Sequence, residues 1–155
     1  MAGKIEARLE ELGITLPVPA APVANYVGFV RSGNLVFVSG QLPLENGKPS
    51  HTGKAGGERT TEEAQLAARN CAINIIAQLK MACDGDLDRV KRIIRLGGFV
   101  ASTPDFTDQP KVINGASDLM VEVFGDAGRH CRTAVAAPSL PLDVTVEIDA
   151  IAEIE

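Results

Sequence analysis

Two charged side chains lie within the apolar, strand-like segments that close the sequence. Arg132 lies near the start of the first, CRTAVAA (131–137), and Glu147 lies in the middle of the second, 144–154. An arginine offers a planar fork of N–H donors to an anion, and a glutamate can accept or donate a proton. The pair could therefore perform chemistry. It could also decorate a solvated sheet face, as a surface ion pair worth under about 1 kcal/mol.

Other residues that commonly ligate metals or attack substrates lack the spacing that such sites need. His51 and His130 have no partner at metal-ligand spacing, so we expect no metal site. The stretch GKAGG (53–57) lacks the spacing and the following Ser or Thr of a phosphate-binding loop. No G-x-S-x-G nucleophile elbow occurs, and VSGQ (38–41) is the nearest approach to one. Composition alone leaves a Ser-His-Asp triad open.

Length, charge and composition indicate a single globular domain, residues 1–155. A chain of this size buries about 70% of its surface on folding, so it needs no disulfide or metal to hold it together. Trp is absent and aromatic residues make up 4%, so the core must be aliphatic. The formal net charge of −5, with no basic stretch, argues against nucleic acid as the main partner.

The cysteines and the N-terminus bear on the cellular compartment. Cys71, Cys83 and Cys131 are odd in number and form no C-x-x-C or Cys/His ligand pattern. The stretch AGKIEARLEELG (2–13) is charged and helical in period, unlike a secretory signal. No run of about 18 apolar residues could span a membrane. We therefore expect a cytoplasmic protein with reduced thiols and no membrane partner.

Hydrophobic periodicity and Gly or Pro breakers predict the order of elements. Helical spacing of apolar residues predicts helices over 3–12, 60–82 and 109–124, the second of which begins with a capping box of Thr60 and Glu63. Apolar runs predict strands over 25–30, 35–40 and 90–102, and two closing strands within 130–155, the second over 144–154, that flank a Pro-rich turn.

Two further segments and one cysteine complete this description. Residues 16–24 are rich in Pro and Ala and should be extended, so that 1–19 form a helical and extended N-terminal extension. Residues 44–59 should form a polar, glycine-rich loop, which could be ordered by a neighbouring segment or be mobile. Cys71 falls on the apolar stripe of the long helix and is expected to be a small core residue.

The order β-β-α-β-α-β-β is typical of an α+β domain with two helices on one face of a sheet. The apolar residues of 144–154 alternate, so Glu147 lies on the face opposite the more apolar one. That second face still carries Ile151 and parts of 93–101. Because a sheet with two partly apolar faces usually has a partner, we expect an oligomer with a ligand cleft at the subunit seam.

Three segments resemble the Rid family, also called the YjgF-type family: VSGQLP (38–43), VINGASDLMVEVFG (112–125) and CRTAVAAPSLPLDVTVEIDAIA (131–152). The stretch YVGFVRSGNLVFVSGQLP (26–43) is similar to the N-terminal hairpin of the family. The resemblance is collinear over about residues 20–152 and is most specific in the closing Arg-to-Glu motif. The chain is most similar to a longer subgroup with an extra N-terminal helix and an extended 44–59 loop.

The resemblance implies a fold and an activity. The implied fold is the small α+β type shared with trimeric chorismate mutases, as a homotrimer with three clefts at the subunit interfaces. The implied activity is the hydrolysis of reactive enamines and imines, such as 2-aminoacrylate and its imine tautomer, to 2-keto acids and ammonia. This activity uses no cofactor, and its partner is a small-molecule carboxylate substrate.

By position, the resemblance assigns carboxylate binding to Arg132 and the orientation of a water molecule to Glu147. It assigns the substrate pocket to Tyr26, Ser39, Gly40, Asn114 and Ala134. The family often has a cysteine where Ala134 stands, so any thiol role is absent here. Cys131 is adjacent to Arg132 and should point to the opposite face of the strand.

Several alternatives stay open at this point. Tyr26 could pack in the core or an interface, Asn114 could be a surface or capping residue, and Ser39 could serve a turn. The arginine could also serve a non-catalytic binder or sensor of 2-keto acids. A ribonuclease or translation inhibitor is a further alternative, against which the acidic composition counts. Chorismate mutase activity would rest on the shared fold alone.

Overall fold

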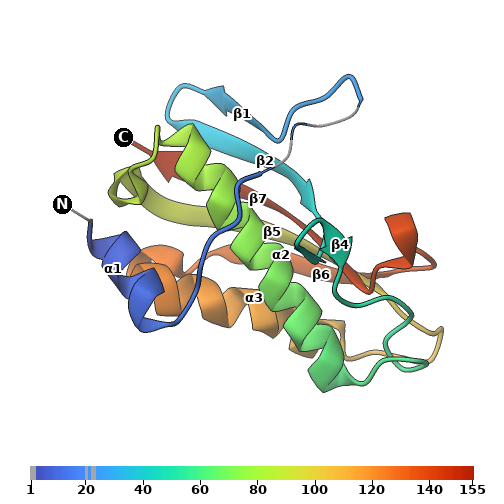
Figure 1. Cartoon of the computed structure of the whole chain (residues 1–155). Helices are drawn as coiled ribbons and strands as arrows, with labels where there is room; N and C mark the ends of the chain where they lie inside the picture. The colour runs from blue at the N-terminus through green and yellow to red at the C-terminus, as the bar shows by residue number, and fades with distance from the viewer. Residues whose placement is uncertain (1–2, 20, 22–23) are drawn as a thin grey trace.

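A five-stranded mixed sheet forms one layer of the molecule, and two long helices cover one of its faces (Figure 1). The structure is a computed structural model that describes residues 3–19, 21 and 24–155. In spatial order the strands are β1 (Phe29–Ser32), β2 (Leu35–Gln41), β7 (Val146–Ile154), β5 (Val90–Ala101) and β6 (Cys131–Ala137). Only the β5–β6 pairing in this sheet is parallel. The expected α+β class and the order of the main elements are confirmed.

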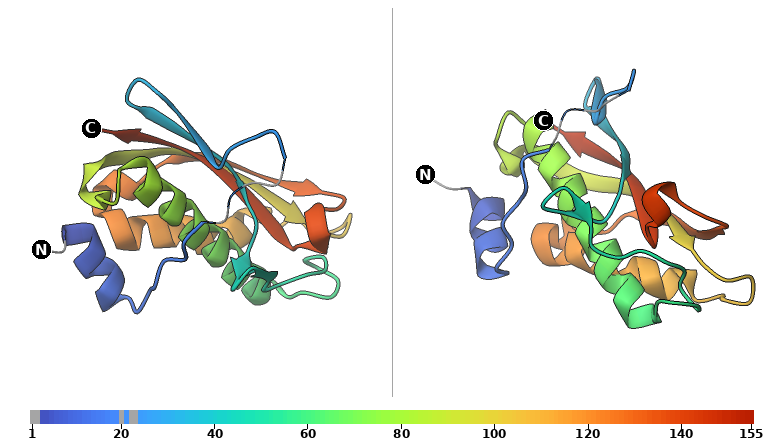
Figure 2. Two further views of the ribbon diagram at one scale, coloured as in Figure 1. Left: turned by 45° about the horizontal axis from the view of Figure 1, so that its top comes forward. Right: turned by 45° about the vertical axis from the view of Figure 1, so that its right-hand side comes forward.

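The two long helices are α2 (Thr61–Ala82) and α3 (Gln109–Phe124). α2 contacts β2 and β7, and α3 contacts β5 and β6, so both lie on the same side of the sheet (Figure 2). α2 begins at the expected capping box, in which the Glu63 N–H donates to the Thr60 hydroxyl and the Thr60 N–H donates to the Glu63 carboxylate. No helix within the described ranges is long and apolar enough to cross a membrane.

Alternation along β7 separates the two faces of the sheet. Every second residue from Val146 to Ile154 is buried beneath the helices, whereas Glu147 and Asp149 point to the other side. Cys71 of α2 is fully buried on the helix-covered side, with its sulfur 3.6 Å from the Val146 carbonyl oxygen. Burial, followed by the charge of Glu147, raises the pKa of the Cys71 thiol well above its ordinary value. Its expected role as a core residue is confirmed.

The second face of the sheet is open to solvent in one chain and is partly apolar. The side chains of Val30, Phe37, Phe99 and Val135 are 55%, 42%, 38% and 40% exposed. Strand register aligns Glu147 with Phe99, and Phe99 with Val135, in one row across β7, β5 and β6. The expectation that both faces carry apolar residues is therefore confirmed. We call this surface the open face.

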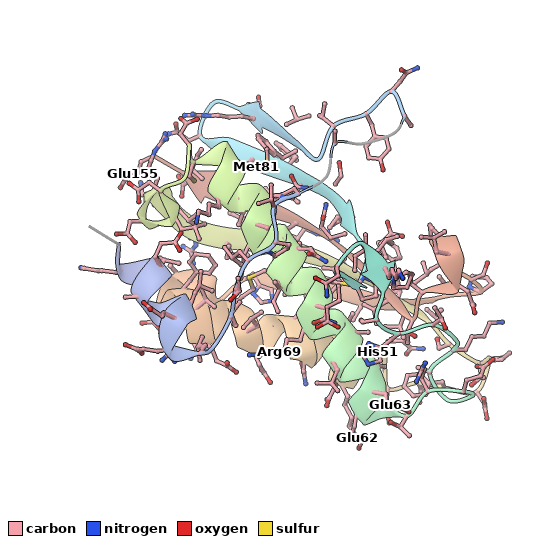
Figure 3. All side chains as sticks on the ribbon, viewed as in Figure 1. His51, Glu62, Glu63, Arg69, Met81 and Glu155 are labelled. Atoms are coloured by element: carbon pink, nitrogen blue, oxygen red, sulfur yellow. The ribbon has the colours of Figure 1, made fainter. Side chains whose placement is uncertain are left out.

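The polar segment 44–59 is more ordered than its composition suggests. It begins with a two-stranded hairpin, β3 (Leu44–Glu45) and β4 (Lys48–Pro49). Ser50 accepts a hydrogen bond from the Asn70 side chain of α2, and its hydroxyl oxygen lies 2.8 Å from His51 Nδ1. Figure 3 shows His51 beside the N-terminal half of α2. The sequence left this order open, because the partners of the segment lie in a distant helix.

The N-terminal hairpin begins later than the sequence predicts. β1 starts at Phe29, so the expected strand over 25–30 is wrong at its first four positions. A Cβ atom at Gly28 would lie 2.5 Å from Gln78 Oε1, so a side chain there would have to displace the Gln78 amide. Ser39 still binds this segment, because its N–H donates to the Gly28 carbonyl oxygen. The segment before Phe29 is therefore held without a regular ladder.

A third helix, α1 (Lys4–Glu11), packs against α3 and the short 3₁₀ turn η1 (Leu87–Arg89). Its N-terminal N–H groups find their acceptor in a distant residue. The carboxylate of Asp88 accepts hydrogen bonds from the backbone N–H groups of Lys4 and Ile5, each at 3.0 Å. These bonds, that from Ile5 first, lower the pKa of Asp88. Asp88 thus caps α1 from outside the helix and attaches the N-terminal extension to the domain.

Replacing Asp88 with Ala should release the first turn of α1, because two N–H groups then lose their acceptor. We expect a loss of about 1 kcal/mol, as for a typical N-cap, seen as faster amide hydrogen exchange in 4–11. In the native protein this contribution should persist above the ordinary aspartate pKa and fade as the pH falls through the lowered folded-state value. Asp126→Ala, which removes an exposed i,i+3 ion pair, is the control. Equal exchange in both variants would contradict the capping role.

Candidate functional site

Arg132 lies on the helix-covered face of β6, at the edge of the sheet. Its register partner in β5 is the buried Leu96, which faces the same helices. The guanidinium is half-buried and reaches α3. Nη1 donates to Asn114 Oδ1 at 2.8 Å and to Ser117 Oγ at 3.0 Å, and Nη2 donates to the Pro110 carbonyl oxygen at 3.2 Å. α3 therefore fixes the orientation of this side chain.

The hydrogen bonds of Arg132 leave N–H donors on Nε and Nη2 free. The group has five N–H donors, of which α3 takes both from Nη1 and one from Nη2. Within the described residues, Nε–H and the second Nη2–H have no acceptor. Two donors on adjacent nitrogens match the two oxygens of a carboxylate. The arrangement can thus hold an anion whose carboxylate is planar.

Asn114 and Ala134 lie beside this guanidinium. Asn114 lies in the second turn of α3, and its side-chain oxygen accepts a hydrogen bond from Arg132. It is therefore not a capping residue. Ala134 shares the face of Arg132, since it is two residues further along β6, and packs against the core. Cys131 points away and is exposed, as expected. In the structure, Arg132 thus donates a hydrogen bond to Asn114 and shares its strand face with Ala134.

Sequence patterns missed two residues of this group, Ser117 and His130. Ser117 Oγ lies 2.8 Å from His130 Nε2, and His130 Nδ1 lies 2.7 Å from the Gly128 carbonyl oxygen. A signal was available, because Ser117 follows Asn114 by three residues on a helix and His130 precedes Arg132 by two. Each spacing puts two side chains on one face. His130 therefore has two hydrogen-bond partners, Ser117 and the Gly128 carbonyl.

Glu147 lies on the open face, in the central strand β7. It is half-buried beside Gly40, where any side chain would collide with its carboxylate. Burial, and then the nearby charge of Asp149, raise the pKa of Glu147. Arg95 forms an ion pair with Asp149, in which Arg95 Nη1 lies 3.8 Å from Asp149 Oδ1. A carboxyl group with a raised pKa near a cleft is typical of general acid–base chemistry.

A cavity of about 540 Å³ lies between α2, the hairpin β1–β2 and the N-terminal extension. Tyr26, Ser39 and Gly40 line it, together with the side chains of Asn74 and Gln78 from α2. The Ser39 hydroxyl donates to the Val27 carbonyl oxygen at 2.6 Å, so it shapes the wall of the cavity. Tyr26 is 60% exposed in the turn before β1, so within one chain it is not a core residue.

The predicted site residues thus form two groups in one chain. Arg132 and Ala134 lie on the edge strand β6 with Asn114 of α3 beside them, Tyr26, Ser39 and Gly40 lie by the β1–β2 hairpin, and Glu147 lies beside Gly40 in the central strand β7. Arg132 and Glu147 point to opposite faces, so the hypothesis of a surface ion pair between them is wrong. In the described part of the chain, no group of three or more His, Cys, Asp or Glu side chains could hold a metal ion.

Comparison with known proteins agrees with this fold. A family model described as "YjgF/chorismate_mutase-like, putative endoribonuclease" matches residues 6–154. Protein TCP17 of Trypanosoma cruzi is 49% identical over 154 residues, covering 99% of this chain and 96% of that protein. The crystal structure of a protein of unknown function from Agrobacterium tumefaciens is 56% identical, with a TM-score of 0.92, covering 97% of this chain and 92% of that one.

A more distant relative has a named activity. The 2-iminobutanoate/2-iminopropanoate deaminase of Dermatophagoides farinae is 25% identical over 142 residues, covering 92% of this chain and 95% of that protein. The family match spans nearly the whole chain and confirms the resemblance carried by the segments 38–43, 112–125 and 131–152. By sequence and by fold, this chain belongs to the YjgF/chorismate mutase-like family.

Proposed function

We propose that this chain hydrolyses 2-imino acids, and the enamines that tautomerise to them, to 2-keto acids and ammonia without a cofactor. The observation that carries the proposal is the free edge of the Arg132 guanidinium, which α3 holds by three hydrogen bonds. A 2-imino acid presents a planar carboxylate next to an electrophilic carbon. A relative with a deaminase name, at 25% identity, supports the same reaction class.

The arginine would bind the substrate by its carboxylate and fix the plane of the imine. A bidentate clamp sets both position and orientation, so the imine carbon is presented to water in one geometry. A protonated imine is already electrophilic, so holding it beside a water molecule provides much of the rate enhancement. Tyr26 would wall the pocket and offer its hydroxyl, with Ser39 and Gly40 shaping the opposite side.

Glu147 would transfer protons between the attacking water and the leaving nitrogen. Its carboxylate accepts a proton as the water oxygen bonds to the imine carbon, which gives a carbinolamine. The same carboxyl group then returns the proton to nitrogen, and its carboxylate takes the hydroxyl proton as the C–N bond breaks, so that ammonia leaves and the keto group forms. The raised pKa of Glu147 suits a group that must both accept and donate.

We further propose that the site is completed between copies of the chain in a homotrimer. The two groups of site residues lie toward opposite edges of the sheet, β6 and β1–β2, so a head-to-tail contact would bring them together. Head-to-tail contacts that close form rings. The exposed Phe37, Phe99 and Val135 of the open face supply apolar surface that such a ring would cover.

A non-catalytic binder of 2-keto acids is the second candidate. The same arginine would bind the carboxylate, and Ala134 leaves no thiol in the pocket that could take part in chemistry. The family description also names endoribonucleases. The net charge of −5 gives little support to RNA binding, which salt-dependent titration with RNA would test.

Replacing Arg132 with Ala should reduce kcat/KM for imine hydrolysis by about 10- to 100-fold, because a charge-assisted clamp is lost. Arg132→Lys keeps the charge without the planar fork, so its kcat/KM should lie between those of the wild type and Arg132→Ala. An amino-acid oxidase would generate 2-imino acids in situ, and semicarbazide would trap what the enzyme leaves. Arg129→Ala, a neighbouring exposed arginine, is the matched control.

The same assay separates the two candidates. If the wild type suppresses trapping and Arg132→Ala does not, the deaminase proposal stands. If the wild type suppresses trapping with no amino acid yet binds pyruvate through Arg132, the protein is a binder. If Arg132→Ala hydrolyses imines as fast as the wild type, the proposed clamp is wrong.

The acidic limb of the pH–rate profile should report the protonation of the Glu147 carboxylate. Because its pKa is raised, activity should fall, as the pH drops, at a higher pH than an ordinary glutamate would give. Asp149→Asn removes the like charge and should move this limb to lower pH. Glu147→Gln should abolish the limb together with most of the activity. A limb that does not move in Asp149→Asn would contradict the assignment.

Sedimentation velocity should give three times the 16.3-kDa chain mass for the wild type. Val135→Lys, on the open face, should shift the protein toward monomers because it introduces an unpaired charge into the proposed contact. Leu66→Lys, at an exposed position of α2, is the matched control and should leave the mass unchanged. A monomeric wild type would remove the proposed shared site.

A further inference from the structure

We infer that Ser117 and His130 are positioning residues that hold the Arg132 guanidinium in the orientation that a carboxylate ligand requires. They form a hydrogen-bond relay that begins at the Gly128 carbonyl and ends at Nη1 of Arg132. The consequence for ligand binding rests on the proposed function, whereas the relay itself can be tested without a ligand.

Chemistry fixes the direction of each hydrogen bond in the relay. The Gly128 carbonyl oxygen can only accept, so the proton lies on His130 Nδ1, 2.7 Å away. In a neutral imidazole Nε2 then carries a lone pair and accepts from the Ser117 hydroxyl, at 2.8 Å. The serine oxygen is left with lone pairs, one of which accepts from Arg132 Nη1 at 3.0 Å.

The relay starts from a rigid point of the fold. Gly128 ends the short 3₁₀ turn η2 (Gly125–Gly128) and is buried against the last turns of α3. A side chain there would collide with the Met120 carbonyl, so glycine is required by close packing. The relay joins Gly128 of the η2 turn, Ser117 of α3 and Arg132 of β6. The relay therefore fixes the edge strand against the helix at the level of Arg132.

The relay determines which edge of the guanidinium is available. Asn114 and Ser117 together take both N–H groups of Nη1. With both occupied, the guanidinium cannot pivot about its long axis, and the Nε edge stays free for a ligand. Without the serine acceptor one Nη1 proton is released, and the free edge no longer has a single orientation. Ser117 acts on the ligand through Arg132, and His130 acts through Ser117.

The first experiment measures the tautomer of His130 by ¹⁵N NMR, with no ligand, at a pH where the ring is neutral. The chain has two histidines, so a His51→Gln variant leaves one set of ring signals. We expect the Nδ1–H tautomer in the full chain. Ser117→Ala should also speed rotation of the Arg132 guanidinium, seen in its side-chain ¹⁵N relaxation. An Nε2–H tautomer, or unchanged Arg132 relaxation, would overturn the relay.

The second experiment measures affinity for pyruvate by calorimetry in four variants. Ser117→Ala and His130→Asn should weaken binding about 10-fold, the loss expected for one hydrogen bond to a charged group. His130→Gln should bind more tightly than His130→Asn, because its amide oxygen can replace Nε2 as the acceptor. Ser117→Thr keeps the hydroxyl and should bind like the wild type. With imine substrates, KM should rise in the weakened variants while kcat stays within about two-fold.

The outcomes separate the relay from the proposed function. If neither the wild type nor Arg132→Ala binds pyruvate, the proposed function fails, and the NMR measurements still decide the relay. If the wild type binds and Ser117→Ala, folded by circular dichroism, binds equally well, the relay does not position Arg132. If His130→Gln binds no better than His130→Asn, His130 does not act as the acceptor for Ser117.

Discussion

The packing of two helices on one face of the sheet is the constraint on which the rest of the structure depends. It buries alternate residues of β7 and leaves Glu147 on the opposite side. It also gives Arg132, at the edge of the covered face, a helix surface to bind. The two charges therefore cannot meet in one chain. Any chemistry that needs both requires a second chain, and the apolar open face gives that chain a surface to cover.

α3 prepares the arginine for binding before any ligand arrives. A free arginine side chain would lose considerable rotamer entropy on binding a ligand, whereas three hydrogen bonds to α3 have already restricted this one. The acceptors differ in kind, because two are side chains and the third is the backbone carbonyl of Pro110 in the first turn of the helix. The proline ring fixes φ at that position, so this carbonyl is itself held in place.

The cavity between α2 and the β1–β2 hairpin depends on close approaches of the backbone to side chains. Gly28 lies against the Gln78 amide, and Gly40 lies against the carboxylate of Glu147, so a side chain at either position would displace one of these groups. The amide of Asn74 donates to the carbonyl oxygens of Leu42 and Leu44, which fixes the chain beyond β2. The cavity is thus lined by the Asn74 and Gln78 amides together with apolar side chains such as Leu42 and Leu44.

The sequence by itself determined the element order, the two faces of β7, the core position of Cys71 and the grouping of Arg132 with Asn114. The first three follow from local periodicity, and the grouping of Arg132 with Asn114 follows from the resemblance to the Rid family. Tertiary structure alone decided that Arg132 and Glu147 face apart, that segment 44–59 is ordered, and that His130 joins Arg132 through Ser117. The reason is that these relations join segments distant in the chain, so the packing of helix on sheet sets them and periodicity within one segment does not.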